Sequence, residues 1–257
     1  MSDIHPTAII DPSAIIGAGT RIGPYCIIGA GVELGPDCHL HGHVTIMGPT
    51  KIGTGNEFYP YASIGQRTQD LKYAGEPTFL EIGVRNCFRE FVTVNRATAP
   101  HGKTIVGSYG NFLAYAHIAH DCIVGDHVIF SNNGTLGGHV IVGDYVIIGG
   151  LSAVHQFCRI GEHAMIGGCT KIVQDVPSFM IADGNPAEIR GINQAGLERR
   201  GFSVEDIKEL RNAYKTIYRS SLNTAQAVEA LEKKHESSAF IKELLNFIKE
   251  SKRGIIK

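Results

Sequence analysis

The chain has 257 residues, of which 43% are hydrophobic and 19% are charged, and its formal net charge is -1. This composition suits a packed core and gives no reason to expect a nucleic acid as the main partner. The opening residues, MSDIHPTAII, lack the basic segment and apolar run of a secretory signal. No apolar run approaches the roughly 20 residues that span a bilayer, so we expect a cytoplasmic protein without a membrane span.

Aliphatic and aromatic residues recur every six positions along most of the chain. They form three stretches, Ile16 to Ile64, Ile82 to Val94 and Val106 to Ile172, and glycine often follows the repeated residue directly. A period of six fits neither an amphipathic helix, at about 3.6, nor an isolated strand, at about 2. It is typical of a hexapeptide β-helix, in which three repeats of strand and turn close a coil of about 18 residues. The sequence therefore predicts a mainly β fold, a parallel β-helix whose repeated residues point inward.

Most of the six cysteines fit the same pattern. They are scattered and include no Cys-x-x-Cys pair, which argues against a zinc ribbon or a disulfide framework. Cys26, Cys38, Cys122 and Cys158 each lie four places after a repeated apolar residue. That phase also points inward, so we expect these four side chains to pack in the core.

Two polar segments rich in turn residues interrupt the repeat. They are QRTQDLKYAGEPTF, Gln66 to Phe79, and NRATAPHGKT, Asn95 to Thr104. Both are expected to project from the β-helix as loops, and loops on a rigid scaffold often carry function.

The repeat ends near Pro177, and helical spacing begins after a connecting stretch. In FSVEDIKELRNAYKTIYRS, Ser203 is a suitable N-cap. The apolar positions of this helix are Val204, Ile207, Leu210, Ala213, Tyr214 and Ile217. NTAQAVEALEKKH and SAFIKELLNFIKE predict further helices. We expect a β-helix with both loops over residues 1–192, and a small α-helical domain over residues 193–257 that covers its open end.

Because each coil has 18 residues, the sequence predicts where each histidine lies on the β-helix. His120, Gly138 and Gln156 lie 18 apart and should stack on successive coils, roughly 4.8 Å from one another. Other polar residues fall within a few places of the same corner, namely His117, Asp121, His139 and His155. Four histidines on one face favour a functional site over isolated surface positions.

One chemistry for such a patch is metal binding, which needs three ligands and an open position. The zinc enzymes built on this repeat, the gamma-type carbonic anhydrases, use a His-x4-His pair, and no two histidines here are five apart. The tract HLHGHV, His39 to His43, resembles a metal-binding tract but lies many coils away. We therefore expect no metal and no cofactor in the patch.

The other chemistry is general base catalysis. A histidine such as His120 can accept a hydroxyl proton near neutral pH. Asp121 would fix its tautomer, and the N–H of Gly138 would stabilise an oxyanion. These groups suit acyl transfer.

Several motifs, in chain order, carry a resemblance to a known family. They are QDLKYAGEPT, AHIAHDC, GGHV, AVHQFC, GGC, QDVP and RRGF, and they span nearly the whole chain. Together they resemble the bacterial UDP-N-acetylglucosamine O-acyltransferases, which begin lipid A synthesis. The resemblance implies a homotrimer of left-handed parallel β-helices with active sites between subunits. It also implies transfer of a 3-hydroxyacyl chain from acyl carrier protein to the sugar 3-hydroxyl.

At the positions that match the family motifs, the resemblance implies that His120 is the general base, that Asp121 is its partner and that the N–H of Gly138 is the oxyanion donor. The other matched positions contact the substrates. Asp70 and Lys72 match positions that contact the sugar and its phosphate, and the polar groove is matched by His117, His139, His155 and Gln156. The nucleotide contacts are matched by Asn193, Arg199 and Arg200, and the position at the end of the acyl chain is Gly168.

The chain departs from the family pattern at three positions. It has Asn95 where family members have histidine, Ala97 where they have glycine, and Ala195 where an acidic residue is usual. These departures leave a 3-amino sugar open as the acceptor. The related N-acyltransferase of the same pathway normally carries a uridine-binding domain ahead of the repeat, which here begins by Ile16. A zinc-dependent hydratase and a purely structural solenoid are the alternatives from other classes.

Overall fold

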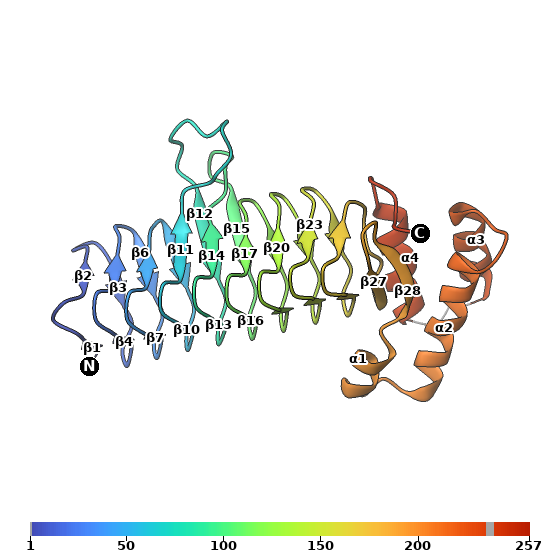
Figure 1. The fold of residues 1–257 in the computed structure, drawn as a ribbon, viewed down its shortest axis with the longest axis horizontal. Coiled ribbons are helices and arrows are strands. Elements are labelled where there is room, and N and C mark those ends of the chain that lie inside the picture. Colours follow the sequence, from blue (N-terminus) through green and yellow to red (C-terminus); the bar gives the residue numbers. More distant parts are fainter. Residues whose placement is uncertain (1, 235–238) are drawn as a thin grey trace.

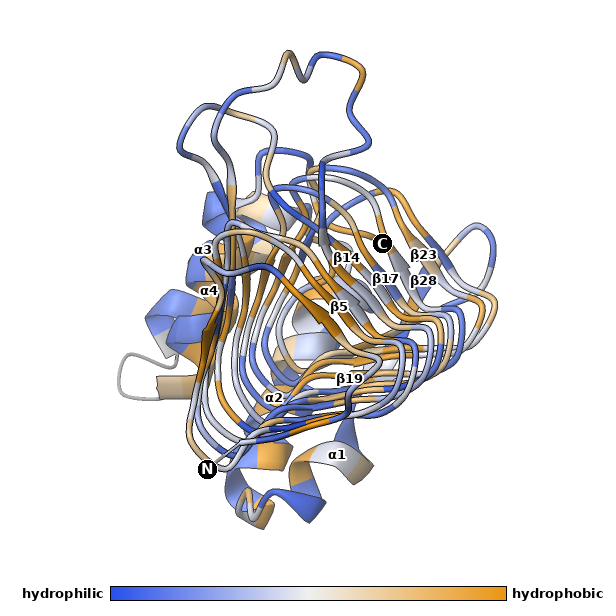
Figure 2. Ribbon diagram, turned by 90° about the vertical axis from the view of Figure 1, so that its left-hand side faces the viewer, coloured by the Kyte–Doolittle hydropathy of each residue, from blue (hydrophilic) through white to orange (hydrophobic). Residues whose placement is uncertain are grey.

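The computed structural model describes residues 2–234 and 239–257. Short strands wind along one axis as a left-handed parallel β-helix, and helices gather at one end of it (Figure 1). Viewed along the axis, the coils superpose as a triangle, and two loops extend from one corner (Figure 2). The fold expected from the period of six is confirmed.

Three sheets form the walls of the prism, and successive strands of the chain enter them in the order A, B, C. Sheet A contains β1 (Asp3–Ile4), β4 (Arg21–Ile22), β7 (His39–Leu40), β10 (Glu57–Phe58), β13 (Cys87–Phe88), β16 (Asn111–Phe112), β19 (Ile129–Phe130), β22 (Ile147–Ile148), β25 (Met165–Ile166), β27 (Met180–Asp183) and β28 (Glu188–Ile192). Sheet B contains β2 (Ile9–Ile10), β5 (Ile27–Ile28), β8 (Thr45–Ile46), β11 (Ser63–Gln66), β14 (Thr93–Asn95), β17 (His117–Ile118), β20 (Thr135–Leu136), β23 (Ala153–Val154) and β26 (Lys171–Ile172). Sheet C contains β3 (Ile15–Ile16), β6 (Val32–Leu34), β9 (Thr50–Ile52), β12 (Phe79–Ile82), β15 (Lys103–Val106), β18 (Ile123–Val124), β21 (Ile141–Val142) and β24 (Arg159–Ile160). We name each corner by the sheets it joins, as the A-to-B, B-to-C or C-to-A turn.

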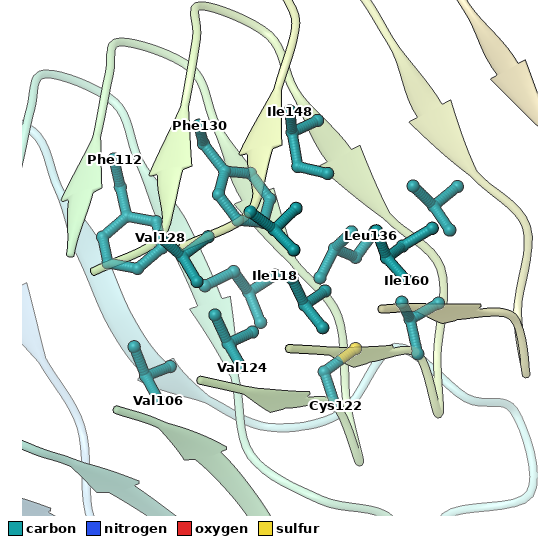
Figure 3. Packing of buried hydrophobic residues seen from close by; sticks show 14 of the residues in the cluster. Val106, Phe112, Ile118, Cys122, Val124, Val128, Phe130, Leu136, Ile148 and Ile160 are labelled. Atoms are coloured by element: carbon teal, nitrogen blue, oxygen red, sulfur yellow. The ribbon is translucent and has the colours of Figure 1, made fainter. Parts of the chain in front are cut away.

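The core is a continuous stack of the repeated apolar residues (Figure 3). Ile118 pairs with Leu136, and Leu136 pairs with Val154, so residues 18 apart lie on neighbouring coils. All three side chains are at most 2% exposed. Burial of each such side chain contributes roughly 1.5–3 kcal/mol, which explains why short strands suffice.

The four cysteines expected in the core lie there. Cys26, Cys38, Cys122 and Cys158 are at most 1% exposed. Burial raises the pKa of the Cys122 thiol to about 12, and its Sγ donates to the carbonyl of Gly137. This cysteine is a packing residue and is not poised as a nucleophile.

Rings line the C-to-A turns and stack from coil to coil. The ladder consists of Tyr109, His127, Tyr145, His163 and Phe179, with centroids 4.7–5.8 Å apart. Each of these residues has a positive φ, between 56° and 69°. The left-handed conformation is costly for a residue with a Cβ, and the stacked rings offset that cost.

Both interruptions of the repeat leave the prism at B-to-C turns. Leu34 pairs with Ile52, 18 positions later, whereas Ile52 pairs with Ile82 and Ile82 pairs with Val106. The first interruption, between β11 and β12, therefore adds 12 residues to its coil, and the second, between β14 and β15, adds 6. Sheet pairing continues on either side, and within the described residues the only irregularity between these strands is a register shift from Ile64 to Gln66, where the loops begin.

The segment after Pro177 differs from the connecting stretch that the sequence indicates. β27 joins sheet A in parallel, and β28 then pairs with it in the antiparallel direction. The chain makes this hairpin because β28 covers the last edge of sheet A, whose N–H and C=O groups need partners. Period-six counting cannot detect an antiparallel strand.

Helices α1 (Gln194–Arg199), α2 (Val204–Tyr218), α3 (Thr224–Lys234) and α4 (Ala239–Glu250) follow. Ser203 caps α2, as the sequence indicates, and the structure shows that it does so in a capping box with Asp206. Val204, grouped with the apolar face, is instead 77% exposed because it lies in the first turn of α2, beyond the packed face. Of the helices in the described part of the chain, none is long and apolar enough to cross a lipid bilayer.

Candidate active site

His120 and Asp121 form a hydrogen-bonded pair at the turn that follows β17. The Nδ1 of His120 lies 2.8 Å from Oδ2 of Asp121, and the two side chains are 13% and 11% exposed. Since a carboxylate only accepts, Nδ1 carries the proton in this bond. The lone pair of Nε2 is therefore available to accept another proton.

The backbone around Asp121 holds its carboxylate in place. The N–H of Thr98, in the second loop, donates to both carboxylate oxygens at 3.2 and 3.0 Å. The N–H of Asp121 itself donates to the hydroxyl of Thr104 at 2.8 Å. The carboxylate is thus oriented by the loop as well as by its own turn, where Asp121 has a φ of 60°.

Gly138 lies against the imidazole of His120 from the next coil. A Cβ built on Gly138 would come within 2.6 Å of Nε2, closer than real Cβ atoms approach other atoms. Among the residues the structure describes, no acceptor receives the N–H of Gly138. The imidazole of His120 therefore lies next to a residue whose backbone donor has no partner in the described residues.

Two more histidines complete this polar surface. His139 packs edge-on against His120 with centroids 5.3 Å apart, and its Nε2 is 3.7 Å from Asp121. His117 lies in β17 with its Nδ1 2.7 Å from the hydroxyl of Thr93. Burial, followed by the proximity of His120, lowers the pKa of His117, so it is neutral at pH 7. A neutral ring suits substrate contact.

His155 and Gln156 lie one coil beyond and are exposed, with the ring of His155 3.1 Å from the carbonyl of Gln156. The first loop adjoins the same corner. There, Asp70 accepts the N–H of Lys72 and Lys72 is exposed. The pocket of about 480 Å³ beside this loop is lined by Gln66, Arg67, Thr68, Gln69, Asp70, Leu71, Tyr73 and Asn95.

Asn95 has one unpaired polar atom in this pocket. Its Nδ2 donates to the carbonyl of Arg67 at 2.7 Å, whereas its Oδ1 is buried without a partner in the described residues. Burying an acceptor without a hydrogen bond is unfavourable, so this atom is suited to a donor from a bound molecule.

Four of the predicted site residues lie away from His120 within one chain. Gly168 follows β25, on the A-to-B turn, and Asn193 caps α1 with its side chain bonded to Gly196 and to the carbonyl of His163. Arg200 packs over Tyr145 on the C-to-A turn and donates to its carbonyl, and Arg199 is exposed. A single prism thus places these four at other corners from the histidine cluster.

Residues that no motif singled out also contribute. Thr98 and Thr104 orient Asp121, and Arg96 bonds to the carbonyls of Gly48 and Gly65, which fastens the second loop to the prism. The only signal in the sequence was the interruption of the repeat, which placed all three in or beside a projecting segment.

The cluster His120, Asp121 and His139 brings three possible metal-ligand atoms within 4.8 Å of one another. However, the carboxylate of Asp121 already accepts from Thr98 and His120. A base oriented by a carboxylate, next to a free N–H, is the arrangement used for proton transfer coupled to oxyanion stabilisation.

Comparison with known proteins identifies relatives of the whole chain. The family model for "Udp N-acetylglucosamine O-acyltransferase; Domain 2" matches residues 175–256, and the model for the bacterial transferase hexapeptide matches residues 2–36. The structure of LpxA from Acinetobacter baumannii is 47% identical with a TM-score of 0.96 and covers 99% of both chains. That of the UDP-N-acetylglucosamine O-acyltransferase from Moraxella catarrhalis is 46% identical with a TM-score of 0.95, again over 99% of both chains.

A more distant relative has the same extent. The UDP-N-acetylglucosamine acyltransferase of Arabidopsis is 39% identical with a TM-score of 0.89, over 99% of this chain and 100% of that one. Identity at these levels over the full length establishes homology across both the β-helix and the helices. The chain belongs to the UDP-N-acetylglucosamine O-acyltransferase family.

Proposed function

We propose that His120 is the general base of an acyltransferase that moves a 3-hydroxyacyl chain from acyl carrier protein to the 3-hydroxyl of UDP-N-acetylglucosamine, in lipid A synthesis. The observation that carries this proposal is the contact between His120 and Gly138. The His120 ring lies against Gly138, whose N–H has no acceptor in the described residues, and attack on a thioester carbonyl requires a base and an oxyanion donor close together.

The steps follow from that geometry. Nε2 of His120 accepts the proton of the sugar hydroxyl while its oxygen bonds to the thioester carbon. The carbonyl π electrons move onto oxygen, and the resulting oxyanion accepts the N–H of Gly138. Collapse of this intermediate breaks the C–S bond, and the imidazolium returns its proton to the departing thiolate of the carrier.

Asp121 stabilises the imidazolium and holds its Nδ1–H, so the ring keeps one orientation through both proton transfers. His117, His139, His155 and Gln156 would bind the substrates along the groove. Asp70 and Lys72, on the first loop, would contact the sugar and its phosphate.

We further propose that the working form is a homotrimer. Gly168, Asn193, Arg199 and Arg200 lie at corners other than that of His120 in one chain. Packing three prisms around an axis would bring another corner of a second copy to the histidine cluster. The nucleotide and acyl-chain contacts would then come from the neighbouring subunit.

The direct test is His120→Ala assayed with 3-hydroxyacyl carrier and UDP-N-acetylglucosamine. We expect a trimer with unchanged melting temperature and turnover lower by at least about a hundredfold. A variant that keeps full turnover would overturn the assignment of the base. Running the assay with a 3-amino UDP-sugar as well distinguishes ester from amide formation by product mass. Hydration of carbon dioxide with bound zinc would instead support a hydratase.

A further inference from the structure

A second group of polar side chains lies on sheet A, apart from the B-to-C turn that carries His120. In β7, Leu40 points into the core and His39 points outward. Glu57 is the outward residue of β10 and pairs directly with His39. His41 follows β7 and lies beside both. Two adjacent coils thus hold two imidazoles and a carboxylate together.

The distances within this His39–His41–Glu57 cluster are those of a site that needs little rearrangement. Oε1 of Glu57 lies 3.6 Å from Nδ1 of His39 and 2.9 Å from Nε2 of His41. Each of the three residues offers a ligand atom within 4.8 Å of those of the other two. Donor atoms about 2.0–2.1 Å from a tetrahedral zinc ion are roughly 3.3 Å apart, so small side-chain rotations suffice to enclose the ion.

Glu57 brings one carboxylate to the cluster. Within residues 2–234 and 239–257, the ion-pair partners of Glu57 are the two histidines alone. A divalent cation placed between this carboxylate and the two rings would meet a ligand atom from each of the three side chains. A positive group also lies beside the cluster, because the guanidinium of Arg21 is 3.3 Å from Nδ1 of His39. It is exposed, so it can turn into solvent when an ion binds.

We propose that His39, His41 and Glu57 form a binding site for one Zn²⁺ ion, or a divalent cation of similar softness, with water as the fourth ligand. Two imidazoles and a carboxylate are a set of three protein ligands that zinc accepts. The site differs from the His120–Asp121–His139 group, because there the backbone N–H of Thr98 already donates a hydrogen bond to the carboxylate of Asp121. The ion takes no part in acyl transfer and links β7 to β10.

The experiment is a zinc titration of the full-length protein after chelation. Equilibrium dialysis with elemental analysis gives stoichiometry and affinity, and Co²⁺ replacement reports geometry through its visible absorption. We expect one ion per chain, tetrahedral Co²⁺ bands, and a melting temperature that rises with zinc concentration. His41→Ala should lower the affinity at least about tenfold, and Glu57→Gln serves as a second variant if the first does not fold.

Matched variants decide where the ion sits. His43→Ala changes a histidine of the same tract whose ring stacks between Tyr25 and Tyr61, and it should leave binding unchanged. Arg21→Ala should tighten binding, because it removes the competing cation. Binding that survives both His41→Ala and Glu57→Gln, or that disappears in His139→Ala instead, would overturn the proposal, as would the absence of stoichiometric binding. None of these readouts depends on acyl transfer.

Discussion

The hydroxyls of Thr68 and Thr98 lie 2.7 Å apart and join the two projecting loops to each other. The Thr68 hydroxyl also accepts the N–H of Asp70, while the N–H of Thr98 donates to Asp121. A continuous series of hydrogen bonds therefore runs from the first loop to the proposed base. Binding of a sugar at the first loop would thereby help to orient His120.

This connection predicts a coupled effect of two conservative substitutions. Thr98→Val keeps the backbone N–H but removes the hydroxyl, and Thr68→Val does the same from the other side. Thr98→Val should lower kcat/KM about fivefold, the usual effect of losing one neutral hydrogen bond, and Thr68→Val should lower it further because it also removes the acceptor of the Asp70 N–H. Because both break the contact between the loops, the double variant should be little worse than Thr68→Val alone. Additive losses in this cycle would show that the loops act independently.

Gly138→Ala should inactivate the enzyme without unfolding it. The new Cβ would meet the His120 ring, which lies within 2.6 Å at Nε2, and would push the base out of line. We expect turnover to fall by at least about a hundredfold. Gly191→Ala is the matched control, because a Cβ there meets nothing within 4 Å. Normal turnover of Gly138→Ala would contradict the proposed contact.

Gly168→Met should change the preferred acyl chain. The nearest atom to a Cβ at Gly168 is the carbonyl oxygen of Gly150, at 3.5 Å, so the position accepts a side chain without moving the backbone. The longer side chain would then fill the end of the groove and favour shorter acyl chains. A competition among 3-hydroxyacyl carriers of graded length, read by mass spectrometry, tests this. An unchanged preference would remove Gly168 from the chain-length role.

His163 should make stability depend on pH. Burial, followed by the charge of Arg200, lowers its pKa to about 4 from the ordinary 6.5, although Asp144 acts in the opposite direction. Above pH 6.5 the ring is neutral in both folded and unfolded chains, and stability is full. As the pH falls from 6.5 towards 4, His163 becomes protonated in the unfolded chain but stays neutral in the folded chain, which lowers the stability. The loss is about 2 kcal/mol at pH 5.

His163→Phe isolates this contribution. Phenylalanine keeps the stack between Tyr145 and Phe179 and already occupies the last step of the ladder. The fall in melting temperature between pH 7 and pH 5 should be smaller in this variant than in the parent protein. His127→Phe, in the same ladder, is the control and should retain the parental fall. Equal losses in all three proteins would refute the role of His163.

The prism could be predicted from the sequence because each coil repeats one local rule. Ile118 and Cys122 point inward because they stand at the same two positions of the repeat that are buried on other coils. Counting in steps of 18 residues correctly placed Gly138 beside His120. What the period cannot supply is anything outside the coil. The bond from Thr98 to Asp121 depends on how an irregular loop folds back, and the pairing of β28 with β27 reverses the strand direction. The separation of Arg200 from His120 likewise depends on which corner each residue occupies.

The two loop insertions have a consequence for how such a protein can be altered. Both enter at a B-to-C turn, and the strands beyond them resume their pairing as if nothing had been added. Length at a corner is thus uncoupled from the stacking that supplies stability. The prism can therefore acquire or exchange recognition segments one turn at a time. A deletion within a strand, by contrast, would shift every later residue out of its row.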